Sequence, residues 1–180
     1  GGGVYCYSVN ATNIVANCVI VGNTAGSNGG GIYCTSSSTP VLLNCVVSGN
    51  SSGNAGGGGY CSQSSAAFEN CLLAGNAAVY GGGLYATGSS PVLTNCVVSG
   101  NWADTFGGGL YGYSGSGTLA NCTVSENGAG EAGSAAYFSS TSTWSLRNTI
   151  FEGHGGAEAA VYESGILSDA APVNCLFNGN

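Results

Sequence analysis

Residues 81–101 have the sequence GGGLYATGSSPVLTNCVVSGN, which contains five glycines, two apolar runs and no charged side chain. The same order of letters, GGG–apolar–Tyr followed by apolar–x–Asn–Cys and then Gly–Asn, returns in seven successive segments, of which the last three are degenerate. The tyrosines that mark the repeat are 28, 27, 25, 26, 26 and 25 residues apart: Tyr5, Tyr33, Tyr60, Tyr85, Tyr111, Tyr137 and Tyr162. A period of this length is typical of a solenoid, in which each repeat forms one coil.

The letters within each repeat indicate β-structure. Every copy has three short β-like runs separated by Gly, Asn, Ser and Pro, and no copy has ten helix-favouring residues in a row. Three strands per coil of about 25–28 residues predict an all-β parallel β-helix of seven coils, with neighbouring coils paired about 4.8 Å apart. We place the coils, within one domain, at 1–28, 29–55, 56–80, 81–106, 107–132, 133–157 and 158–180.

Alternation along each strand assigns a direction to each column of equivalent residues. We expect the core to be filled by four columns: Val4, Ile32, Leu84, Leu110 and Val161; Cys6, Cys34, Cys61, Ala86 and Phe138; Val15, Leu42, Phe68, Leu93, Leu119 and Leu146; and Ile20, Val47, Leu73, Val98, Val124, Phe151 and Phe177. The seven tyrosines would then point outward as one exposed stripe, which we interpret as an interaction surface for another protein chain or a glycan. Strand propensity and stacking between coils are the alternative explanation.

Two polar columns mark the corners. The residues Asn17, Asn44, Asn70, Asn95, Asn121, Asn148 and Asn174 fall on one column, where amide side chains can bond to the coils above and below and tolerate a turn conformation. We therefore predict a structural asparagine ladder. The pairs Gly22–Asn23, Gly49–Asn50, Gly75–Asn76, Gly100–Asn101 and Gly179–Asn180 mark a second corner, where a positive φ is easily adopted by Gly and tolerated by Asn.

Cysteine also recurs by column, as Cys18, Cys45, Cys71, Cys96 and Cys122 and as Cys6, Cys34 and Cys61. Stacked neighbours lie within the Cα range of a disulfide, but their Cβ vectors run parallel and would strain the bond. We favour buried free thiols that act as small apolar side chains. Disulfides between coils and a soft-metal site are the alternatives, although thiolates about 25 residues apart lack a preorganised chelating turn.

At this point the repeats resemble a known family. The GGG–apolar–Tyr motif and motifs such as Val47–Ser48–Gly49–Asn50 and Phe177–Asn178–Gly179–Asn180 are similar to those of right-handed parallel β-helix repeat (pectin-lyase-like) surface proteins. The likeness is strongest to the polymorphic outer-membrane-protein and autotransporter-passenger type. It covers the whole chain and implies a right-handed solenoid, which also follows from the crossover rule, together with export and a role in adhesion or surface structure.

Charge excludes several kinds of partner. Arg147 is the only permanent cation, Lys is absent, and the formal net charge is −7. The chain therefore has no electrostatic footprint for nucleic acid or anionic lipid. No apolar run approaches the roughly 18–20 residues of a membrane span, so we expect no membrane insertion.

The sequence offers little catalytic apparatus, and we expect neither an enzyme nor a cofactor. Carbohydrate-cleaving β-helices generally need clustered Asp or basic residues, whereas this chain has two Asp and one basic residue besides its single His. The remaining candidates are Glu126, Glu152 and His154, because Glu152 aligns beside Ser125 of the preceding coil and would lie near Glu126 as in a glycosidase pair, with His154 close by.

Metal and ice-binding functions are also not expected. A calcium solenoid needs an Asp in every repeat, but Asp104 and Asp169 stand alone. An ice-binding face needs a regular array of Thr, and Thr35, Thr94 and Thr123 scatter between columns. We therefore predict no metal site.

Two of three glycosylation sequons are plausible acceptors, Asn10 and Asn50, since the third, at Asn121, falls in the predicted ladder.

The printed sequence begins with Gly1–Gly2–Gly3–Val4–Tyr5 and ends with Leu176–Phe177–Asn178–Gly179–Asn180, which are parts of the repeat motif. Solenoids normally shield terminal coils with caps, so we expect either caps outside this sequence or self-association end to end.

These observations together predict a non-enzymatic, extracellular or cell-surface structural protein, as a β-helical subunit of a surface filament, matrix or adhesin. Its expected partners are further copies of itself, with glycans as candidates. The alternative is a polysaccharide-binding or polysaccharide-cleaving β-helix that uses the tyrosine stripe.

Overall fold

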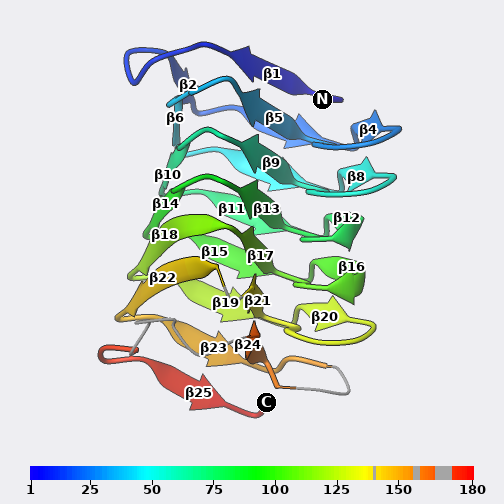
Figure 1. The fold of residues 1–180 in the computed structure, drawn as a ribbon, viewed down its shortest axis with the longest axis vertical. Coiled ribbons are helices and arrows are strands. Elements are labelled where there is room, and N and C mark those ends of the chain that lie inside the picture. The colour runs from blue at the N-terminus through cyan, green and yellow to red at the C-terminus, as the bar shows by residue number, and fades with distance from the viewer. Residues whose placement is uncertain (140, 156–158, 165–171) are drawn as a thin grey trace.

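Short strands wind the chain into a stack of coils, with the two termini at opposite ends of the stack (Figure 1). The computed structural model describes residues 1–139, 141–155, 159–164 and 172–180. The strands are two to six residues long, because residues with positive φ turn the chain between them. All strand pairs in the described residues are parallel and join one coil to the next, which confirms the all-β parallel β-helix.

Sheet A carries the tyrosines. Its strands pair in chain order and are β1 (Val4–Tyr7), β5 (Ile32–Thr35), β9 (Gly59–Ser62), β13 (Leu84–Thr87), β17 (Leu110–Tyr113), β21 (Ala136–Ser139) and β24 (Val161–Ser164). The register places Tyr5 beside Tyr33, Tyr33 beside Tyr60, and so on to Tyr162. The predicted tyrosine column is therefore confirmed.

Sheets B and C flank the Asn–Cys corner. Sheet B consists of β2 (Ile14–Ala16), β6 (Val41–Leu43), β10 (Ala67–Glu69), β14 (Val92–Thr94), β18 (Gly115–Ala120) and β22 (Ser142–Arg147). Sheet C consists of β3 (Val19–Val21), β7 (Val46–Ser48), β11 (Leu72–Ala74), β15 (Val97–Ser99), β19 (Thr123–Ser125), β23 (Ile150–Glu152) and β25 (Leu176–Asn178).

A fourth sheet, sheet D, adds to the three strands expected in each coil. It consists of β4 (Thr24–Ala25), β8 (Ser51–Ser52), β12 (Ala77–Tyr80), β16 (Trp102–Phe106) and β20 (Gly128–Ala129), on the loops at the right of Figure 1. Three of these strands have only two small or polar residues, which is why they give no apolar signal in the sequence. The expected boundary between the last two coils, at 157–158, lies outside the described residues.

The four predicted columns form most of the core, together with Trp144 and the buried cysteines of the Asn–Cys corner. Cys34, Leu42, Val47, Phe68 and Leu93 are each at most 1% exposed, as are most of their equivalents in other coils. Val4, Val15 and Val161 are only partly buried. Phe177 was predicted to fill the interior but is 46% exposed, because it lies in the last coil of the stack and only one face of its ring is covered, by Phe151 at 4.9 Å between centroids.

The Gly-Gly-Gly motif forms the turn from sheet D into sheet A. In the fourth coil Gly81 adopts φ +61, a conformation that a residue with a Cβ rarely adopts. At Gly83 an added Cβ would lie 2.5 Å from the Gly109 carbonyl oxygen of the next coil and 3.2 Å from the Asn101 side chain. The glycines thus allow successive coils to approach closely, which explains why the motif recurs.

No helix in the described part of the chain has the length and apolar character needed to cross a bilayer.

Candidate interaction surface and side-chain ladders

The seven tyrosines of sheet A form one continuous stack of rings, the tyrosine column. Successive centroids lie 5.4, 5.0, 5.3, 4.9, 5.0 and 5.2 Å apart, and the interplanar angles are between 7° and 27°. Such offset stacking is favourable between aromatic side chains. From sheet D, Tyr80 meets Tyr111 edge-on at 5.9 Å, and Phe106 stacks on Tyr137 at 4.6 Å.

This stacking corrects the prediction of an exposed stripe. Tyr5 is 60% exposed, but the other six tyrosines of the column are half-buried. Each ring covers a face of the next, so the column presents ring edges to solvent. Burial raises the pKa of the Tyr60 hydroxyl, and it raises the pKa of Tyr111 to about 12. Alternation predicts the direction of a side chain but does not predict how far its neighbours cover it.

The predicted asparagine ladder, the outer ladder, is present on the surface. Each Nδ2 donates to the Oδ1 of the asparagine in the preceding coil over 3.1–3.3 Å, from Asn174 through Asn148, Asn121, Asn95, Asn70 and Asn44 to Asn17. All seven have φ between +48 and +56. The prediction that this column combines a turn with amide bonding between coils is confirmed.

A second asparagine ladder, the inner ladder, was not predicted. It runs through the Gly–Asn corner, where Asn50, Asn76, Asn101 and Asn127 are at most 1% exposed. In the third coil the Asn76 Nδ2 donates to the Val47 carbonyl at 3.0 Å and to Asn101 Oδ1 at 2.9 Å, while Asn76 Oδ1 accepts from the Asn50 backbone N–H at 3.0 Å. Each buried amide thus bonds to backbone groups of a neighbouring coil as well as to the next amide, so its polar atoms are satisfied inside the core.

His154 takes the place of an asparagine in the inner ladder. Its Nδ1 accepts from the Asn127 backbone N–H at 3.3 Å, and its Nε2 lies 3.1 Å from the Val124 carbonyl oxygen. An unprotonated Nδ1 and a protonated Nε2 reproduce the acceptor and donor of an amide, which assigns a neutral imidazole with its proton on Nε2. Burial lowers the pKa of His154 and favours this neutral form.

The candidate acid pair is only partly assembled. Ser125 pairs with Glu152, which confirms the predicted alignment, and the Glu126 N–H donates to the Glu152 carbonyl at 3.1 Å. Both glutamates are exposed and line a surface groove of about 390 Å³. Because both ring nitrogens of His154 are engaged in the inner ladder, His154 does not join this pair as predicted.

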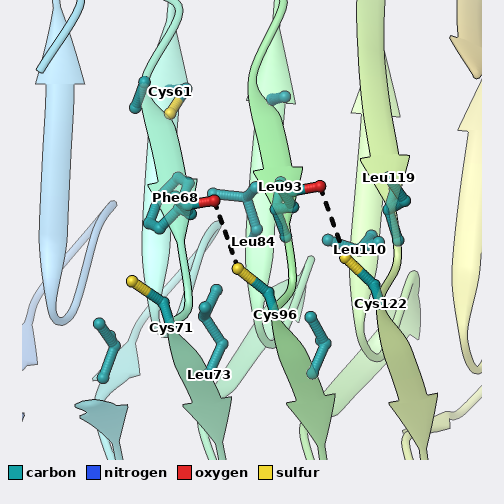
Figure 2. Packing of buried hydrophobic residues seen from close by; sticks show 14 of the residues in the cluster. Cys61, Phe68, Cys71, Leu73, Leu84, Leu93, Cys96, Leu110, Leu119 and Cys122 are labelled. Atoms are coloured by element: carbon teal, nitrogen blue, oxygen red, sulfur yellow. Dashed lines mark hydrogen bonds between the residues drawn. The ribbon is translucent and has the colours of Figure 1, made fainter. Parts of the chain in front are cut away.

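All nine cysteines are free thiols, and seven of them are buried. At the Asn–Cys corner Cys96 Sγ donates to the Phe68 carbonyl of the preceding coil at 3.3 Å, and Cys122 Sγ donates to the Leu93 carbonyl at 3.5 Å (Figure 2). Hydrogen bonding with Cys122 and Cys71 raises the pKa of the Cys96 thiol, and burial acts in the same direction. Cys18 departs from the predicted buried column, because it lies in the first coil and is exposed.

The remaining predicted residues do not gather into one site. Asn50 is 1% exposed and its amide bonds to the Ile20 carbonyl at 2.9 Å, so the fold does not support a glycan at this position. Asn10 is exposed and remains a candidate acceptor. Asp104 accepts a hydrogen bond from the indole of Trp102, and Asp169 lies outside the described residues. In the part of the chain that the structure describes, no three His, Cys, Asp or Glu side chains form a group that could hold a metal ion.

Comparison with known proteins agrees with this architecture. Residues 52–180 match the family model described as the right-handed beta helix region. No curated protein and no solved structure matched the chain. The matched range covers well over half of the sequence and includes most of the coils described above. The chain therefore belongs to the right-handed β-helix family.

Proposed function

We propose that the protein is a non-enzymatic structural component of the cell exterior, a β-helical subunit of a surface filament, matrix or adhesin. This proposal rests on the contacts that the most frequently repeated side chains make between coils. The tyrosine column, both asparagine ladders and the Cys96-type thiols all bond or stack from one coil to the next. The repeated residues therefore hold successive coils together along the solenoid axis.

This arrangement suits a mechanical role. Each coil contributes the same small set of contacts to both neighbours, so stability is the sum of coil and interface terms and grows with the number of coils. The outer wall carries ring edges and amides with few charges, which allows close lateral approach of another chain. Burial of seven thiols would also protect them from oxidation outside the cell.

The alternative, a polysaccharide-binding or polysaccharide-cleaving β-helix that uses the tyrosine column, has less support. Sugars pack on aromatic ring faces, and in the column those faces cover one another. Both ring nitrogens of His154 are engaged with backbone groups of the inner ladder, so the imidazole does not serve Glu126 and Glu152 as an acid or base.

Localisation on cells that produce the full-length protein tests the proposal. We expect antibodies raised against this chain to label the surface of intact cells, and added protease to remove the label. The purified chain should release no reducing sugar from neutral or acidic polysaccharides. Labelling only after permeabilisation, or turnover of a polysaccharide, would refute the proposal.

A further inference from the structure

The two tryptophans of the chain have opposite environments. Trp144 is 3% exposed in the core, whereas Trp102, at the start of β16 on sheet D, is 49% exposed. We propose that Trp102 and Glu126 form a binding site for neutral glycans, in which Asp104 holds the indole of Trp102 in place. This inference goes beyond the proposed function, because a structural solenoid requires no ligand site.

The indole of Trp102 is held in place by two contacts. Trp102 pairs with Gly128 in the next coil, and a Cβ added to Gly128 would fall 2.7 Å from Cε3 and Cζ3 of the indole. The six-membered ring of the indole therefore packs over Gly128, where any residue with a Cβ would clash with it. At the other end of the ring system, Nε1 donates to Asp104 Oδ1 at 3.0 Å. A ring fixed in this way loses little conformational entropy when a ligand binds.

The ring borders a surface groove with room for a sugar unit. The groove has a volume of about 320 Å³ and is lined by Trp102, Glu126 and small residues or backbone of three coils, including Gly100, Gly128 and Gly155. The small neighbours leave the indole open to solvent, in contrast to the tyrosine column. The C–H groups of a pyranose ring carry partial positive charge and pack favourably on the negative face of an indole.

The polar groups around the ring select the class of sugar. Asp104 holds the indole through Nε1, and the exposed Glu126 lies on the groove wall, where its carboxylate can accept hydrogen bonds from sugar hydroxyls. Both acidic side chains count toward the formal net charge of −7, and the only Lys or Arg of the sequence, Arg147, does not line the groove. A uronate would be repelled here. Neutral hexose or N-acetylhexosamine chains fit this site.

Fluorescence of the full chain provides the test. Acrylamide, a neutral quencher, quenches exposed tryptophan, so in the wild-type protein it should quench Trp102 more strongly than the buried Trp144. We expect cellohexaose or N-acetylated chitohexaose to protect Trp102 from acrylamide, and hexagalacturonate to give no protection. In isothermal titration, Trp102→Ala should weaken binding of the neutral oligosaccharide about tenfold or more.

Tyr113→Ala is the matched control, since Tyr113 is 50% exposed but lies on sheet A. We expect it to bind the neutral oligosaccharide as the wild type does. Gly128→Ala keeps the tryptophan but displaces its ring, and it should weaken binding while the acrylamide-quenchable emission remains. Thermal unfolding of each variant shows whether it is folded. Failure of both neutral oligosaccharides to protect Trp102, equal protection by hexagalacturonate, or unchanged binding by folded Trp102→Ala would overturn the inference. None of these outcomes bears on surface localisation.

Discussion

His154 accepts a hydrogen bond from the backbone N–H of Asn127 through Nδ1, at the position where the equivalent coils use an asparagine oxygen. The imidazole can hold this position only while Nδ1 is unprotonated. Protonation would set an N–H against the Asn127 N–H, and would place a charge at a half-buried position. The inner ladder therefore contains one member that responds to pH.

We predict that the chain becomes less stable as the pH falls below about 6.5, the ordinary pKa of His. Burial lowers the pKa of His154 in the folded state, so between the folded and unfolded pKa values the unfolded chain binds more protons. The free energy of unfolding then decreases by up to about 1.4 kcal/mol per pH unit in that window. Urea unfolding at pH 7.5, 6.5 and 5.5 measures this slope.

His154→Asn is the control for this slope. The chain has a single histidine, and asparagine is the residue that the rest of the inner ladder uses. The variant should lose the part of the slope that comes from protonation of the imidazole. An unchanged slope in His154→Asn would show that another group is responsible.

The two asparagine ladders should differ in their contribution to stability. Asn76→Ala removes four side-chain hydrogen bonds in the core and takes away the acceptor of the buried Asn50 N–H. We expect a loss of about 2–4 kcal/mol in the free energy of unfolding. Asn70→Gly keeps the positive φ on the exposed outer ladder and should cost about 1 kcal/mol or less. Similar costs for both in denaturant unfolding would contradict the distinction.

Much of this fold could be predicted because each coil repeats the same letters. The tyrosine column, the outer ladder and the pairing of Ser125 with Glu152 follow from aligning the copies. The alignment also contained a signal that was missed: Gly153–His154 occupies the Gly–Asn position, which identifies His154 as a ladder residue.

Other features depend on packing that one column does not reveal. Asn76 is buried and Asn70 is exposed, although both are asparagines at a corner of the coil. Only the geometry of each corner determines whether the side chain points into the core or to solvent. The Trp102 site requires the register that places Gly128 beside it on a sheet with weak sequence signal. Coverage of the tyrosines by one another is likewise a property of the assembled stack.

The tyrosine column should contribute to stability through its stacked rings. Tyr85 lies between Tyr60 and Tyr111, with centroids at 5.3 and 4.9 Å. Replacement by Ala leaves two ring faces uncovered, and we expect a loss of about 2 kcal/mol in the free energy of unfolding. Tyr113→Ala, at an exposed position of the same sheet, should cost less than about 1 kcal/mol. Equal losses in guanidinium unfolding would show that stacking contributes nothing.

The thiols should differ in their reactivity. Cys18 is exposed and Cys175 is half-buried, whereas the other seven are buried. A charged thiol reagent should therefore modify Cys18 rapidly and Cys175 more slowly, and the others only after unfolding, because burial denies the reagent access to them. Mass spectrometry of peptides after timed labelling measures the order. Rapid labelling of Cys96 in the native protein would contradict the buried column.

The close approach of coils at the Gly-Gly-Gly motif predicts strong intolerance of a single methyl group. At Gly83 a Cβ would meet the Gly109 carbonyl and the Asn101 side chain, so Gly83→Ala must either separate two coils or displace a member of the inner ladder. We expect a loss of about 2–3 kcal/mol in the free energy of unfolding. Gly26→Ala is the matched control, since no atom lies within 4 Å of its added Cβ, and it should change stability by less than about 0.5 kcal/mol. If both variants unfold at the same denaturant concentration, the coils can accommodate a methyl group at Gly83 without loss of stability, and the close approach of coils does not explain the glycine.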